Sequence, residues 1–124
     1  MWRYCVVGNI IKSHLDEDGI IHYGTSSYVG GTKVYLCGKH WLPSQKEISV
    51  IGLSRGKRYY VDDVPIGLIE NIRCQRTYKP AILNIMGNFE YDDCWWSNTK
   101  EDKEATEAFV ASIKEHRKDE QNNG

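Results

Sequence analysis

The sequence contains no long hydrophobic run. No apolar stretch approaches the roughly 20 residues that a transmembrane helix requires, so we expect neither a membrane span nor a membrane partner. Residues 1–14 hold a short apolar stretch that Gly8 and Asn9 interrupt, and this segment has no small-residue cleavage site. The segment is therefore unlike a signal peptide, and we expect it to form the first strand of a cytoplasmic protein.

Closely spaced cysteines are also absent. Cys5, Cys37, Cys74 and Cys94 lie 20 or more residues apart, whereas cysteine zinc sites usually pair their ligands about two to four residues apart. The first three cysteines each sit inside an apolar or strand-like run. We expect these three to be buried, reduced thiols that take part in neither a metal site nor a disulfide.

The chain has no dominant charge. Lysine and arginine total 16 and aspartate and glutamate total 17, so the net charge is −1. This balance excludes an overall electrostatic attraction to nucleic acid or to anionic membranes. The 124 residues suffice for one hydrophobic core. We expect a single domain over residues 1–118, followed by a disordered tail at 119–124.

No catalytic or metal-binding motif occurs in the chain. The histidines stand outside any nucleophile motif, and His116 is close to a predicted helix C-terminus, where a cation is stabilising for structural reasons. The acidic runs 16–18 and 90–93 lack the alternating ligands of a calcium loop. We therefore expect no enzyme activity, no cofactor, no metal and no small-molecule substrate.

Residues 31–86 indicate the fold. Short runs rich in β-branched and aromatic residues alternate there with glycine and proline, which is typical of a small, strongly bent antiparallel barrel. We expect a hairpin over 4–23 with a bulge at Gly8, a loop at 24–31 and a helical turn within 64–68. The predicted strands are 4–11, 20–23, 32–37, 47–53, 57–61 and 69–78.

A C-terminal helix follows these strands. Asn98 or Thr99 can cap it, and Glu101 and Asp102 place acidic groups in its first turn. The helix is predicted to end at Arg117. Its predicted buried stripe consists of Ala105, Ala108, Phe109, Ser112 and Ile113. The sequence thus predicts a mostly-β α+β fold, a small SH3-like antiparallel β-barrel with a C-terminal α-helix.

Basic residues interleaved with tyrosines indicate nucleic acid as one candidate partner. Basic side chains beside aromatic rings can hold phosphates and stack bases. Acidic residues lie close to them in the sequence, so a sheet face with internal charge pairing is the more common explanation. We therefore treat nucleic-acid binding as the alternative to protein binding. The basic residues concerned are Arg55, Lys57, Arg58, Arg73 and Arg76.

The aromatic residues favour a protein partner. The chain has four tryptophans and eight tyrosines, the side chains that most often anchor protein interfaces. The acidic and aromatic segment 90–96 suits a basic partner, because charge steers the encounter and rings anchor it. For any single tryptophan, covering a barrel end is an equally good explanation. The expected contact residues are Asp16, Glu17, Trp41, Glu90, Tyr91, Asp92, Asp93, Trp95 and Trp96.

Five segments of the chain are distinctive: CVVGNII, GTKVYLCGKHW, ISVIGLSRGKRY, LIENIRCQRTYKP and DCWW, followed by the charged helix. In these segments the chain resembles small bacterial immunity proteins of polymorphic toxin and contact-dependent growth inhibition systems. The resemblance covers about residues 4–113. It implies a stoichiometric inhibitor that binds a cognate toxin domain, a nuclease being one candidate, and that needs no cofactor. It supplies no contact residues, so those named above rest on residue chemistry.

Overall fold

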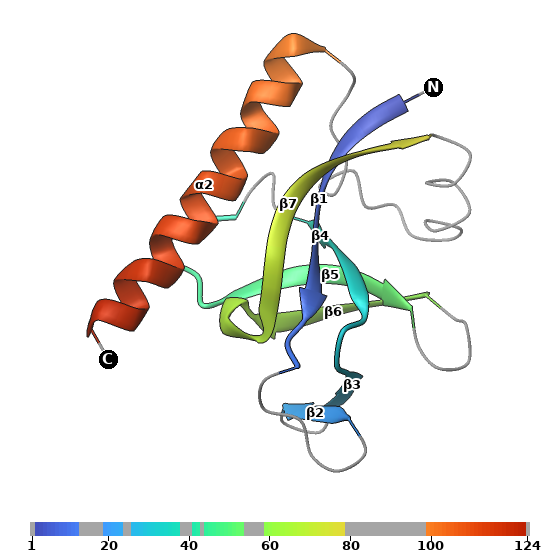
Figure 1. Cartoon of the computed structure of the whole chain (residues 1–124), viewed down its shortest axis with the longest axis vertical. Coiled ribbons are helices and arrows are strands. Elements are labelled where there is room, and N and C mark those ends of the chain that lie inside the picture. Colours follow the sequence, from blue (N-terminus) through green and yellow to red (C-terminus); the bar gives the residue numbers. More distant parts are fainter. Residues whose placement is uncertain are drawn as a thin grey trace.

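The computed structural model describes residues 2–12, 19–23, 26–37, 41–42, 44–53, 59–78 and 99–123. These residues form a mostly-β α+β fold with strands β1 to β7, a short 3-10 helix η1 and a C-terminal helix α2 (Figure 1). The bounds are β1 Trp2–Ile10, β2 Ile20–Tyr23, β3 Ser26–Val29, β4 Lys33–Cys37, β5 Glu47–Leu53, β6 Tyr59–Pro65, η1 Ile66–Leu68, β7 Ile69–Tyr78 and α2 Lys100–Asn123.

Five of these strands form one antiparallel sheet in the order β6-β5-β4-β1-β7, and β2 pairs with β3 in a separate two-stranded sheet. The predicted closed barrel is not found among the described strands, because β6 and β7 are the edges of an open sheet and do not pair with each other. The predicted single helical turn is confirmed as η1, which joins these two edge strands.

The short link through η1 forces the sheet to curl. Pro65 ends β6 and Ile69 begins β7, so three residues join opposite edges, and the chain from Pro65 to Ile69 can span at most about 14 Å. In a flat five-stranded sheet the two edges would stand about 19 Å apart. The sheet must therefore bend until the end of β6 approaches the start of β7. Ile66 N donates to Lys46 O at 3.1 Å, and Ile11 N donates to Leu68 O at 3.0 Å, which fixes the link.

The predicted hairpin over residues 4–23 is wrong. Strand β1 pairs with β4 and β7, while β2 pairs with β3, a strand that the loop prediction for 24–31 missed. Glycine and serine around β3 hide its pattern in the sequence. Tertiary burial favours the strand, because the pairing places Ile21 and Tyr28 in the core.

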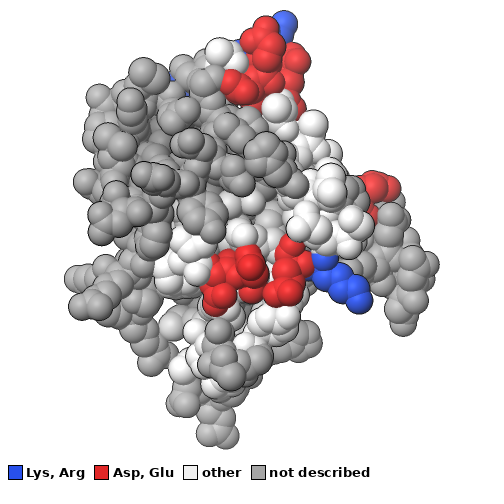
Figure 2. Space-filling model, turned by 180° about the vertical axis from the view of Figure 1, so that it is seen from behind, with Lys and Arg blue, Asp and Glu red and all other residues white. Residues whose placement is uncertain are grey.

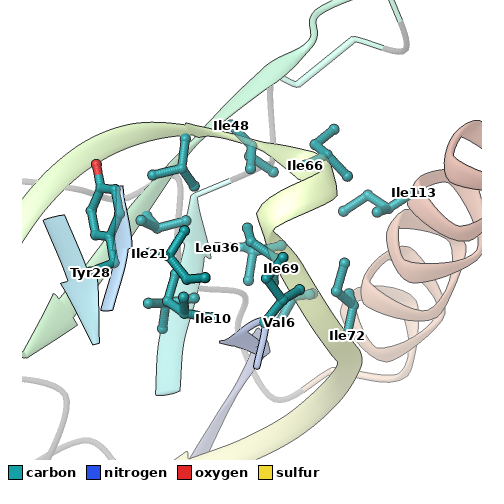
Figure 3. Packing of buried hydrophobic residues seen from close by; sticks show 14 of the residues in the cluster. Val6, Ile10, Ile21, Tyr28, Leu36, Ile48, Ile66, Ile69, Ile72 and Ile113 are labelled. Carbon is teal, nitrogen blue, oxygen red and sulfur yellow. The ribbon is translucent and has the colours of Figure 1, made fainter. Parts of the chain in front are cut away.

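Residues of the sheet alternate between two faces. The core face carries side chains such as Val6, Leu36 and Val50, and both α2 and the β2–β3 hairpin supply residues to the same hydrophobic cluster. Figure 3 shows Ile113 of α2 pointing toward Ile66 and Ile72. The second face is also buried at its centre, through Cys5, Val7, Cys37 and Ile51, which do not belong to that cluster.

Helix α2 begins as the sequence predicts. Thr99 Oγ1 accepts a hydrogen bond from Asp102 N at 3.1 Å and donates to Asp102 Oδ2 at 3.0 Å, so Thr99 is the cap. The buried stripe is rotated from the predicted one: Thr106, Val110 and Ile113 are buried, whereas Ala105 and Ala108 are exposed. The helix continues to Asn123, past the predicted end at residue 117 and into the segment 119–124 predicted as a tail.

Thr106 is a polar residue within the buried stripe. Its hydroxyl donates to Lys103 O at 2.7 Å, which satisfies the donor inside the helix itself. A threonine therefore occupies a fully buried position without leaving a donor unpaired.

Two glycines permit close packing across the sheet. The register between β1 and β7 shifts between Val7 and Asn9, which confirms the predicted irregularity at Gly8. Gly52 of β5 lies opposite Tyr60 of β6, and the Tyr60 ring covers it. A Cβ atom at residue 52 would lie 3.0 Å from Tyr60 Cε1 and closer still to Cζ and the hydroxyl oxygen.

The prediction of buried, reduced thiols is confirmed for Cys5, holds only in part for Cys74, which is reduced but half-buried, and is wrong for Cys37. Cys5 and Cys74 are free thiols, and Cys5 is fully buried. Cys37 is disulfide-bonded, contrary to the expectation of a reduced thiol. Strand-like surroundings indicate burial, and Cys37 is indeed 8 % exposed, but they carry no information on which thiols meet in space. Cys94 lies outside the described residues.

We predict that Gly52→Ala destabilises the protein by about 1–3 kcal/mol, because the new methyl group overpacks against the Tyr60 ring. Chemical denaturation of both variants in a double-mutant cycle measures the coupling. In a Tyr60→Ala background the cost of Gly52→Ala should largely disappear. An equal cost in both backgrounds would show that the ring is not the obstacle.

We also predict that an alkylating reagent labels Cys5 and Cys74, but not Cys37, when the protein is unfolded without reductant. After reduction Cys37 should be labelled as well. Peptide mass mapping after each treatment identifies the modified residues. Labelling of Cys37 before reduction would contradict the disulfide.

Candidate partner-binding surface

A cleft of about 470 Å³ lies between the end of β4 and the start of β5. The lining is mainly polar, and its apolar groups include Trp41 and Ile48. The residues that line it are Cys37, Trp41, Gln45, Lys46, Glu47, Ile48, Ser49 and Asp63. Its shape arises from the sheet register, which sets Cys37 opposite Ser49 and Ser49 opposite Asp63, so that all three lie on the second face.

Acidic groups dominate the described charges of this cleft. Among the described residues that line it, Glu47 and Asp63 are acidic and Lys46 is basic. Ser49 Oγ donates a hydrogen bond to Asp63 Oδ1 and so orients that carboxylate. Seen from behind, the molecule carries acidic side chains gathered near the middle of this view, with basic atoms beside them (Figure 2). A negatively charged hollow of this kind favours a cationic partner group.

Exposed apolar side chains accompany the acidic groups. Leu42 is 60 % exposed and directly follows Trp41, which lines the cleft. Tyr23 of β2 is 39 % exposed and donates its hydroxyl to Glu47. Partial burial first, and then the charge and hydrogen bond of Glu47, raise the pKa of Tyr23 above its ordinary value. Apolar anchors beside charged groups are the usual composition of a protein-binding surface.

Trp41 joins the cleft to the core. Its ring packs edge-to-face on Phe109 and His116 of α2, with centroids 6.1 Å and 5.6 Å away. Its Nε1 is buried and has no hydrogen-bond partner among the described residues. The half-buried ring thus packs against the core cluster as well as lining the cleft. It holds α2 against the loop after β4 and gives the cleft one rigid side.

The outer edge of β6 is poorly suited to pairing with another strand. The bond from Ile66 N to Lys46 O sets the ladder pattern, so Val61, Asp63 and Pro65 direct their backbone groups away from β5. Pro65 has no N–H, and Asp63 N already donates to Asp62 Oδ1 at 2.9 Å. A partner at this side of the cleft is therefore expected to bind through side chains rather than by adding a strand.

Of the sequence-predicted contact residues, the structure describes Trp41 alone. The other eight, Asp16, Glu17, Glu90, Tyr91, Asp92, Asp93, Trp95 and Trp96, lie outside the described residues. Glu47, Asp63 and Leu42 were not predicted. The signal that could have indicated Asp63 is the hairpin register, but the predicted strand 57–61 ended before it, whereas β6 extends to Pro65.

The basic residues of the nucleic-acid alternative do not form one described patch. Arg73 and Arg76 lie on opposite faces of β7, because three residues separate them along a strand. Arg73 Nη1 donates to Asn9 Oδ1 and to Asn71 O, whereas the Arg76 guanidinium lies 5.8 Å from the centre of the Tyr4 ring. Arg55, Lys57 and Arg58 lie outside the described residues.

The described residues show neither a metal-binding cluster nor a membrane-spanning helix. Within the ranges that the structure describes, no three histidine, cysteine or carboxylate side chains converge in a way that could hold a metal ion. No helix in the described part of the chain has the length and hydropathy needed to cross a membrane.

Comparison of the chain with family models, with curated proteins and with solved structures finds no match. The assignment of a function therefore rests on the chemistry of the cleft and on the sequence resemblance.

We predict that Glu47→Gln lowers the pKa of Tyr23, because the substitution removes the negative charge and leaves only a neutral amide oxygen as acceptor. Burial still holds the pKa above 10.0. A raised tyrosine pKa stabilises the fold at lower pH, and that contribution is lost as pH rises from 10.0 through the folded value. The loss at alkaline pH should therefore be smaller in the variant. NMR titration of the Tyr23 ring measures the pKa.

The matched control for this titration is Asp62→Asn. Burial and then the charge of Asp62 raise the pKa of Tyr60, so this variant should lower the pKa of Tyr60 and leave Tyr23 unchanged. If Glu47→Gln leaves the Tyr23 titration where it was, the two groups are not in contact in solution.

Proposed function

We propose that this protein is an immunity protein that binds a cognate bacterial toxin domain and neutralises it by stoichiometric protein–protein interaction. One observation carries the proposal: an acidic cleft lined by Glu47 and Asp63 lies beside the exposed Leu42. The resemblance of five sequence segments to immunity proteins supports a toxin as the partner class.

The charge of the cleft supports a basic toxin surface. A nuclease uses lysine and arginine to hold phosphates, so its substrate-binding surface is positively charged. An acidic cleft can occupy such a surface and exclude nucleic acid, and long-range attraction speeds the encounter. Leu42 and the ring of Tyr23 would then supply apolar contact. The mode of action is occlusion, in which this chain needs no chemistry of its own.

The SH3-like barrel remains a proposal, and one feature of the structure bears on the predicted cytoplasmic location. The three-residue link between the edge strands supports a sheet curled toward a barrel. The disulfide at Cys37 argues against the cytoplasm, where thiols are normally kept reduced. An immunity protein that meets its toxin in an oxidising compartment would accommodate both the disulfide and the proposed function.

Nucleic-acid binding through Arg55, Lys57, Arg58, Arg73 and Arg76 remains the alternative function. A phosphate-gripping protein loses affinity steeply as salt rises. A titration of oligonucleotide binding against salt distinguishes the alternatives, since an immunity protein of net charge −1 should show no binding even at low salt.

We predict that a catalytically inactive toxin domain encoded by the neighbouring gene co-purifies with this protein at one-to-one stoichiometry. The double variant Glu47→Gln/Asp63→Asn should weaken the complex by about ten-fold or more, since it removes two carboxylates from the contact. Calorimetry at two salt concentrations measures the effect, and the variant should be less sensitive to salt than the unchanged protein.

The control is Glu104→Gln/Glu107→Gln, which makes the same charge change on the exposed side of α2. It should bind as the unchanged protein does. An equal loss in both double variants would mean that overall charge, rather than the cleft, determines binding. A complex lost only on replacing the acids of 90–93 and Trp95 would place the contact on that segment instead.

A further inference from the structure

Two cations meet on the second face of the sheet, away from the acidic cleft. The register aligns Tyr35, Val7 and Arg73 in one cross-strand row and sets Lys33 opposite Asn9, so Lys33 and Arg73 project from the same face. Lys33 is exposed and Arg73 is half-buried. The Lys33 side chain reaches Gln75, which is two residues from Arg73 on the same face of β7. Desolvation first, and then repulsion by Arg73, lowers the pKa of Lys33.

Neutral oxygen atoms hold both cations in place. Lys33 Nζ donates to Gln75 Oε1 at 2.6 Å and lies 5.5 Å from the centre of the Tyr35 ring. Arg73 Nη1 donates to Asn9 Oδ1 at 3.1 Å and to Asn71 O at 2.9 Å. Among the described residues, no ion pair joins Lys33 or Arg73 to a carboxylate. Two positive charges are therefore uncompensated by the described part of the chain.

The backbone around Arg73 is shaped for this arrangement. Asn71 adopts a φ of 56°, the left-handed region that a non-glycine residue seldom occupies, and its carbonyl accepts from Arg73. Its side chain donates to Asn9 Oδ1 at 3.3 Å, and Asn9 Nδ2 donates to Gly31 O at 3.1 Å. A strained residue inside a connected polar network indicates that the position of Arg73 is specified rather than incidental.

The geometry points to an oxyanion-binding site at Lys33 and Arg73, which takes a small dianion of the phosphate class. Such an anion can accept hydrogen bonds from both cations at once, and its charge matches the two that the protein leaves uncompensated. Arg73 has guanidinium nitrogens beyond Nη1 that can donate to the anion. The site is distinct from the acidic cleft and does not depend on the proposed function.

A compact ligand fits this site better than a nucleic-acid strand. A strand needs a track of cations that follows successive phosphates. Arg76, the next described cation along β7, lies on the opposite face, over Tyr4. Among the described residues, Lys33 and Arg73 therefore offer two neighbouring cations for one anion, and no further cation of β7 lies beside them on that face.

The test is a titration of the full chain with inorganic phosphate at low and constant ionic strength, followed by NMR of backbone amides and of the Lys33 side chain. We expect saturable shifts centred on Lys33, Arg73 and Gln75, and a rise in the Lys33 pKa when phosphate is bound. Acetate, which carries one charge, should bind more weakly. Lys33→Gln should weaken phosphate binding about ten-fold or more, because one charge-assisted contact is lost.

The matched control is Arg76→Gln, which removes one positive charge from the other face of the same strand. It should leave phosphate binding unchanged. Shifts that fail to saturate, an equal loss in Arg76→Gln, or an unchanged Lys33 pKa would each overturn the site. Tighter binding of a single-stranded oligonucleotide than of phosphate, lost in both variants, would overturn it in favour of an extended nucleic-acid surface.

Discussion

The short link between β6 and β7 is the constraint on which the rest of the structure depends. Because Pro65 and Ile69 belong to opposite edges of the sheet and are four residues apart, the sheet must curl around its core face. The curl creates the concave side that Ile113 of α2 and Tyr28 of β3 fill. At the start of the link, Ile66 N bonds to Lys46 O and continues the β5–β6 register. The same register sets Ser49 opposite Asp63 in the acidic cleft.

Local patterns predicted local structure well. The bounds of β2, β5 and β7 match the alternation of apolar and polar residues, and the cap at Thr99 follows from its neighbours in the first turn of the helix. Local patterns could not predict which distant strands pair with each other. Strand β1 pairs with β7, about 70 residues away, and only packing of the whole core selects this partner.

The candidate site shows the same division. Trp41 was predicted as a contact residue because tryptophan often anchors protein interfaces, and it lines the cleft. Glu47 was missed because it is an ordinary residue at the start of a predicted strand, and Asp63 was missed because the predicted strand 57–61 ended before it. They line the same cleft because β5 pairs with β6, and the disulfide at Cys37 could not be read from cysteine spacing. A sequence motif cannot indicate a site whose residues are brought together only by the pairing of strands.

The outer edge of β6, which is poorly suited to pairing with another strand, bears on aggregation at high protein concentration. Open sheet edges allow copies of a protein to join strand to strand, which is the first step toward fibrils. Here Asp62 binds the outward N–H of Asp63, and Pro65 offers none, so a second copy finds few donors along this edge. The two aspartates also repel the same edge of an identical molecule. This edge therefore disfavours strand-to-strand pairing between copies of the chain.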